Sequence, residues 1–100
     1  MNQFITKSIA EQVPKKVRKE LWLIVKEILS EKNGMKSNTF RCSFQLNTIL
    51  IDSMSYLEIN YSYNNKEVQK RKYLQMDSVI KMNLLVIEQS DSNLLMTYDY

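Results

Sequence analysis

The sequence predicts an α+β domain in which one amphipathic helix packs on an antiparallel sheet of five or six strands. Two observations indicate this class. Apolar residues recur with a helical period only between the single proline, Pro14, and the single glycine, Gly34. From Thr39 onward the period changes to two, which is typical of half-buried strands. Because proline suits the first turn of a helix and glycine the position just past its end, this pair delimits the helix.

The predicted helix runs from about Pro14 to Asn33. Its apolar residues form one stripe, which must face a core. The stripe consists of Val17, Leu21, Ile24, Val25 and Ile28, with Trp22 and Leu29 at its flank.

The remainder of the chain divides into strands. Phe4–Ile9 is a short apolar lead-in that suits an edge strand. The other predicted strands cover residues 39–46, 48–52, 56–63, 66–74, 79–88 and 94–100, with turns at 64–65 and 90–93. The 48–52 segment is either a strand of its own or a continuation of the preceding strand past a bulge. The polar 66–74 strand suits a sheet edge, and the 79–88 strand, apolar on nearly both faces, suits its centre.

Length and composition indicate one soluble domain spanning residues 1–100, because 44% of the residues are hydrophobic and 25% are charged. No apolar run approaches the roughly 20 residues of a membrane span, and the first residues lack the pattern of a secretion signal. The only cysteine, Cys42, has no partner within the chain for a disulfide. We therefore expect a cytoplasmic protein that makes no membrane contact. A net charge of +3 permits nucleic-acid binding without requiring it.

Catalytic chemistry has little support in the sequence. The chain contains no histidine, which is the commonest general acid–base near neutral pH. One cysteine is too few for a structural zinc site, and one glycine excludes glycine-rich phosphate loops. Carboxylate or Mg²⁺ chemistry stays open, but Asp52, Glu58, Asp77 and Glu88 show no diagnostic spacing. The sequence therefore predicts no enzyme, no catalytic residue, no metal and no cofactor.

The segment Ile5-Thr6-Lys7-Ser8-Ile9-Ala10-Glu11-Gln12-Val13-Pro14, followed by Leu21-Trp22, resembles the opening of the domain of unknown function 960 family. That family comprises small proteins of low-GC Gram-positive bacteria and their phages. The resemblance covers about a quarter of the chain. Ile49–Ser53 continues it, except that Asp52 stands where the family usually has a histidine. The resemblance implies the fold and the origin, and the family has no assigned chemistry.

The first candidate site is the outer face of the helix. Lys15, Lys19 and Lys26 form a basic stripe that includes Leu23, and Trp22 lies where this stripe meets the apolar one. Lysines in the first turns oppose the helix dipole, and a local rule broken without compensation suggests a binding site. The alternative is an ordinary solvated face with one stray apolar residue and with Trp22 in the core.

The second candidate site is a basic patch formed by Lys70, Arg71, Lys72 and Tyr73, together with Lys66. Tyrosines on the preceding strand, at positions 56, 61 and 63, would add stacking surfaces for single-stranded nucleic acid. The alternative is that the lysines protect a sheet edge. Cys42 alternates with Phe40 and Phe44, so we expect it to be inert packing in the core.

These observations predict a small non-enzymatic protein-binding module. A specific form is a phage or mobile-element accessory protein that inhibits a host defence nuclease complex by occupying its surface, as anti-CRISPR proteins do. The alternative is a single-stranded nucleic-acid-binding protein that uses the basic, tyrosine-rich sheet. The sequence leaves the partner and the oligomeric state open.

Overall fold

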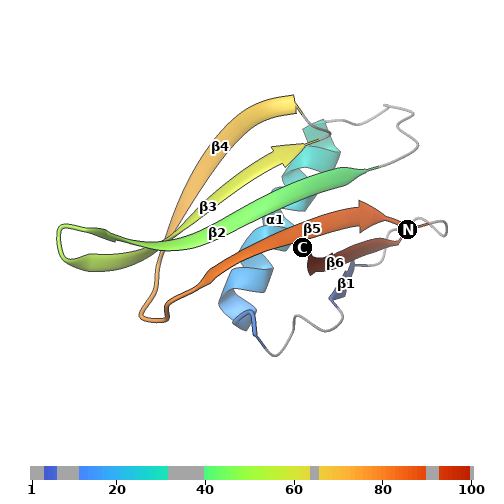
Figure 1. The fold of residues 1–100 in the computed structure, drawn as a ribbon. Coiled ribbons are helices and arrows are strands. Elements are labelled where there is room, and N and C mark those ends of the chain that lie inside the picture. The colour runs from blue at the N-terminus through green and yellow to red at the C-terminus, as the bar shows by residue number, and fades with distance from the viewer. Residues whose placement is uncertain (1–3, 7–11, 32–39, 64–65, 90–92, 100) are drawn as a thin grey trace.

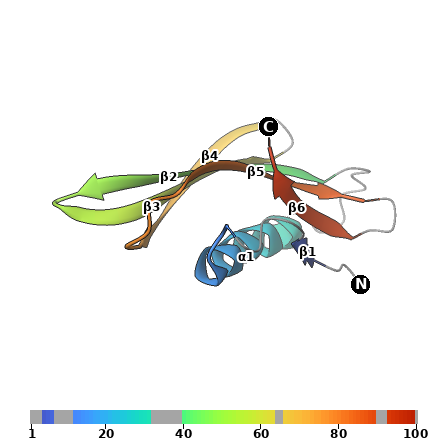
Figure 2. The ribbon, with the colours of Figure 1, turned by 60° about the horizontal axis from the view of Figure 1, so that its bottom comes forward.

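The computed structural model describes residues 4–6, 12–31, 40–63, 66–89 and 93–99. Its elements are β1 (Phe4–Thr6), α1 (Lys15–Glu31), β2 (Arg41–Ile51), β3 (Met54–Tyr63), β4 (Lys66–Gln75), β5 (Lys81–Glu88) and β6 (Leu94–Tyr98). The strands form one sheet in the order β1-β6-β5-β2-β3-β4, and α1 lies against one of its faces (Figures 1 and 2). The predicted α+β class is confirmed. β2 to β6 pair antiparallel, and β1 adds a parallel pair with β6 at one edge.

The helix begins one residue later than predicted, at Lys15. The carbonyl of Pro14 accepts hydrogen bonds from the amides of Val17 at 2.9 Å and Arg18 at 3.0 Å. Pro14 therefore stands at the boundary, where its carbonyl already belongs to the helix and its missing N–H costs nothing. Asn33 and Gly34, the predicted end of the helix, lie outside the described residues.

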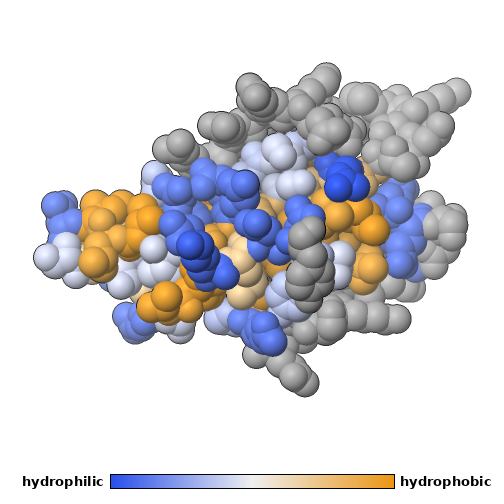
Figure 3. All heavy atoms as spheres, viewed as in Figure 1, coloured by the Kyte–Doolittle hydropathy of each residue, from blue (hydrophilic) through white to orange (hydrophobic). Residues whose placement is uncertain are grey.

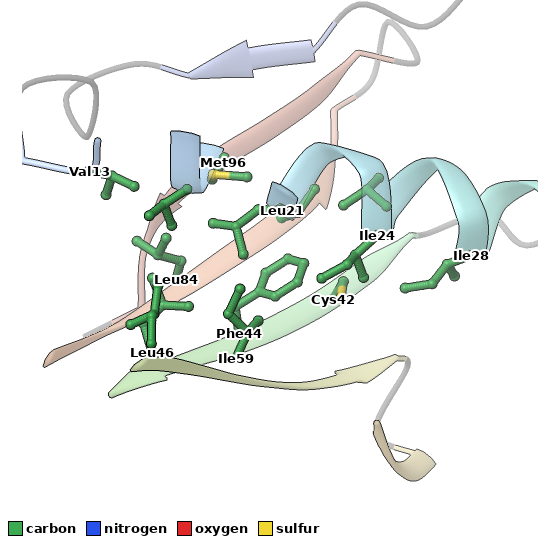
Figure 4. Close-up of a cluster of buried hydrophobic side chains, with 14 of the residues drawn as sticks. Val13, Leu21, Ile24, Ile28, Cys42, Phe44, Leu46, Ile59, Leu84 and Met96 are labelled. Atoms are coloured by element: carbon green, nitrogen blue, oxygen red, sulfur yellow. The ribbon is translucent and has the colours of Figure 1, made fainter. Parts of the chain in front are cut away.

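The core lies between α1 and the sheet, as Figure 4 shows. The five residues of the predicted helical stripe are at most 7% exposed. The sheet side is supplied mainly by its two central strands and their neighbours: Cys42, Phe44, Leu46, Ile59, Leu84 and Met96. All of these strand side chains lie on the face of the sheet that carries α1. The predicted buried side of the helix and the predicted buried faces of the strands are therefore confirmed.

The largest departure from the predicted strands is in β2, which is one continuous strand. Its pairing with β3 runs without a break from Cys42↔Tyr63 to Ile51↔Met54, so no bulge separates residues 46 and 48. Asp52 and Ser53 both have positive φ, at 49° and 67°, and form the two-residue connection to β3. Positive φ at both central residues is the signature of a type I′ turn, whose twist matches that of the strands.

The other strand predictions need smaller corrections. β5 begins at Lys81, and Val79 lies before it with 88% of its surface exposed. β5 lies inside the sheet between β6 and β2, and β4 lies at an edge, as predicted. β6 ends at Tyr98. The predicted turn at residues 64–65 lies outside the described residues, as do residues 7–9, 90–92 and 100.

Replacing Ser53 by glycine is expected to stabilise the fold. Glycine adopts positive φ without the Cβ clash, and after subtracting its larger backbone entropy the gain should be about 0.5–1 kcal/mol. Urea unfolding measures the difference. Ser55→Gly is the matched control, because Ser55 lies in β3 and pairs with Leu50 of β2. Glycine at this strand position should lower the free energy of unfolding by about 0.5–1 kcal/mol. Equal effects of the two substitutions would contradict the turn assignment.

Candidate functional site

The β2–β3 hairpin extends past the part of the sheet that α1 covers (Figures 1 and 2). On β2, the side chains facing the helix are buried at Cys42, Phe44 and Leu46, each at most 2% exposed. Leu50 continues the same row, four residues further along, and is 73% exposed. β2 therefore extends beyond the end of the helix, and Leu50 is exposed to solvent although it lies on the face that is buried elsewhere in the strand.

The end of this hairpin, residues 49–56, exposes apolar side chains on both of its faces, and we call it the hairpin tip. Leu50 lies on the side of the sheet that carries α1. Ile51 and Met54 are cross-strand partners on the opposite side, with 41% and 45% of their surfaces exposed. Figure 3, which views the face away from α1, shows hydrophobic atoms gathered at this end of the molecule. A monomer normally avoids such a concentration unless the surface binds something.

Hydrogen bonds join the connection between β4 and β5 to the base of the β2–β3 hairpin. Thr48 donates its amide to the carbonyl of Ile80 at 2.9 Å, and its hydroxyl accepts the amide of Ile80 at 2.7 Å. The amide of Met76 donates to the carbonyl of Ser55 at 3.2 Å. Val79, the most exposed large hydrophobic residue described, is thereby held beside Thr48 at the base of the hairpin.

The first turn of α1 lies against the same end. Lys16 donates from Nζ to the carbonyl of Gln75, the last residue of β4, at 3.2 Å. Lys15, Lys16 and Lys19 are all exposed. The basic start of the helix therefore lies against the end of β4 that pairs with Tyr56, at the base of the hairpin tip.

The structure separates the residues of the first predicted site into two groups. Lys15, Lys19 and Lys26 are exposed, and Leu23 is 49% exposed. Trp22 is half-buried and packs against the core, which accounts for its place at the edge of the apolar stripe. The outer face of α1 thus presents lysines and one leucine. It has less exposed apolar surface than the hairpin tip.

Of the second predicted patch, the structure describes the side chains of Lys72 and Tyr73, and these two lie on opposite faces of β4. Lys72 crosses to α1 and makes a salt bridge with Glu20, and the Tyr73 hydroxyl donates to Glu58 at 3.3 Å on the other face of the sheet. Lys70 and Arg71 occupy β4 opposite Tyr61 and Asn60, and their side chains, like that of Lys66, lie outside the described part.

The predicted tyrosines are also divided between the two faces. The ring of Tyr61 lies 5.9 Å from that of Phe44, and the ring of Tyr63 lies 5.2 Å from that of Phe40. Both therefore pack on the side that carries α1, whereas Tyr56 and Tyr73 lie on the opposite face. A single stacking surface built from these tyrosines is absent from the described residues.

Cys42 is fully buried under the helix, as expected from its alternation with Phe40 and Phe44. Desolvation by burial raises the pKa of its thiol from 9.0 to about 12. Because the thiolate is the nucleophile and the metal ligand, the side chain acts as a small apolar residue.

This burial predicts a loss of stability in alkali. The folded-state pKa lies above the unfolded one, so the unfolded state releases the thiol proton first. Relative to the ionised thiol, the neutral Cys42 thiol therefore favours the folded state, and the free energy of unfolding is unaffected by its titration below pH 9 and falls as the pH rises toward 12. Urea unfolding between pH 7 and pH 11 should show a steeper decline for the wild type than for Cys42→Ala. Parallel pH profiles would contradict the assignment.

Two other kinds of site are absent from the described residues. No three His, Cys, Asp or Glu side chains gather there in a way that could hold a metal ion. No helix in the described segments is both long and apolar enough to cross a membrane.

Sequence reasoning missed the hairpin tip, although a signal was present. Residues 49–51, Ile-Leu-Ile, form an apolar run without alternation, followed by a polar Asp-Ser pair. Such a run predicts a strand that is covered on both faces. Comparison of the chain with protein-family models, with curated proteins and with solved structures gave no match. The resemblance to the domain of unknown function 960 therefore stays a prediction.

Proposed function

We propose that this protein is a small, non-enzymatic protein-binding module and that its hairpin tip is the main contact surface. One observation carries the proposal: exposed apolar side chains concentrate at one end of the molecule, at Leu50, Ile51, Met54 and Val79. Protein interfaces have an apolar centre and a polar rim. The basic start of α1 supplies part of such a rim.

The proposed function moves the expected binding site from the outer face of α1 to the adjacent hairpin. Lys15 and Lys19 keep a role at the border, and Leu23 and Lys26, two and three turns further along, lie outside the central contact. The narrower form of the proposal is an inhibitor of a host defence nuclease complex in the cytoplasm. It rests on the family resemblance and on the lack of predicted catalytic groups.

Binding of single-stranded nucleic acid has less support. Tyr61 and Tyr63 are engaged on the helix side, and Tyr73 lies beside the Glu58 carboxylate, which repels phosphate. Fluorescence anisotropy with single-stranded oligonucleotides at low salt separates the two functions. Binding at micromolar protein that weakens steeply with salt would favour this second function.

The proposed function is tested by shortening the hairpin without changing its register. In the test variant, Asn-Gly replaces residues 50–55. Ile49↔Tyr56 then closes the turn, and it is the same type of pair as Ile51↔Met54, which closes it now. The immobilised wild type should retain a protein from extracts of a Gram-positive host, and the shortened variant should not. Equal retention by both, or retention by neither, would overturn the proposal.

A further inference from the structure

We propose that the hairpin tip enters a groove of its protein partner, whose apolar walls enclose both faces of the tip and whose floor carries a basic group that pairs with Asp52. This inference rests on the proposed function and specifies the chemistry of the partner's site. It is carried by three features of the tip: its two apolar faces, its turn, and its size.

The two apolar faces require enclosure. Leu50 faces the side of α1 and Ile51 and Met54 face the other side, so a flat partner surface would leave one set in water. A strand with an unbroken apolar run is typical of sheets that are covered on both faces. A groove with two walls provides that cover.

The turn determines what the floor of the groove must contain. Asp52 and Ser53 form the extreme end of the hairpin, and both are exposed. A hairpin that enters a groove carries the Asp52 carboxylate in first. A carboxylate that loses its water requires a cation or several N–H donors in exchange. The expected floor is an Arg or Lys side chain, and the expected rim is acidic opposite Lys15, Lys16 and Lys19.

The size of the tip argues against a second copy of this chain as the occupant. A stable interface uses roughly 20–30 residues a side, and two tips meeting face to face would offer only Leu50, Ile51, Met54 and their neighbours, whereas a groove would contact both faces of the tip, its turn and the lysines at the start of α1. Two such tips would also bring their Asp52 carboxylates together. A bilayer is disfavoured by the same carboxylate, which would lead the insertion into hydrocarbon.

Photo-crosslinking tests the enclosure. Benzoylphenylalanine is placed singly at Leu50, at Ile51, at Leu23 and at Gln45, the last an exposed position within the sheet. In host extract, Leu50 and Ile51 should crosslink to the same polypeptide, unmodified wild-type protein should suppress both adducts, and Gln45 should give none. Adducts from only one of the two faces would overturn the groove. So would adducts only to a second copy of the chain or to lipid.

The outcomes also separate this inference from the proposed function. Adducts from Leu23 alone would leave a protein-binding module in place and overturn the hairpin groove. If no position gives a protein adduct, both fail.

The basic floor is tested with Asp52→Asn, which keeps the shape and removes the charge. Affinity for the crosslinked polypeptide is measured from its retention over a series of concentrations of the immobilised protein. It should fall about tenfold or more. Glu27→Gln, an exposed carboxylate on α1, is the control and should change the affinity less than about twofold. An unchanged affinity for Asp52→Asn would overturn the basic floor.

Discussion

Phe44→Ala is expected to lower the free energy of unfolding by about 3–5 kcal/mol, because truncating a buried aromatic ring leaves the largest cavity. Phe44 is fully buried in β2, at the centre of the sheet. It lies under α1, close to Leu21 and Ile24 in Figure 4, and its ring is tilted against that of Tyr61. The loss combines the missing transfer free energy with the cavity that the surrounding side chains cannot fill.

This loss is a large fraction of the roughly 5–15 kcal/mol that stabilises a typical domain. Urea unfolding monitored by circular dichroism measures it. Tyr73→Ala is the control, because Tyr73 is an aromatic residue of the same sheet with 46% of its surface exposed. Its truncation should cost less than about 1 kcal/mol. Similar losses for the two variants would mean that α1 does not pack on this face of β2.

The helix and the facing of the strands could be predicted because their patterns are local. A period of 3.6 residues over residues 17–28 determines which side of α1 is buried, whatever it packs against. The strand alternation likewise assigns Leu57 and Ile59 to the core face. It also places Tyr61 and Tyr63 with them and Tyr56 on the other face, so the division of the tyrosines was already implicit in the sequence.

The hairpin tip could not be predicted in the same way, because its exposure depends on where the helix ends over the sheet. Ile49, Leu50 and Ile51 have the composition of a buried strand. Only the tertiary arrangement shows that α1 stops short of them. The salt bridge between Lys72 and Glu20 has the same origin, since no local pattern pairs a residue of β4 with one of α1.

Leu50→Asp is expected to weaken binding of the protein partner at least about thirtyfold, the effect of removing a central apolar contact from an interface. The charge would enter an apolar contact without a counter-ion. Because Leu50 is 73% exposed in the unbound protein, its substitution should change the stability by less than about 1 kcal/mol. Graded retention of the partner and urea unfolding measure the two quantities.

Leu23→Asp is the matched control, since it makes the same substitution at an exposed leucine on α1. It should change the affinity less than about twofold if the hairpin tip is the contact surface. The reverse result, a large loss of affinity for Leu23→Asp and none for Leu50→Asp, would return the site to the helix face with Lys15, Lys19, Trp22 and Lys26.

Leu50 and Phe44 lie on the same face of β2, six residues apart. Leu50→Asp is expected to lose binding and keep its stability, and Phe44→Ala is expected to lose stability. Together these results would show that the same row of side chains on β2 belongs to the core under α1 and to the contact surface beyond the end of the helix.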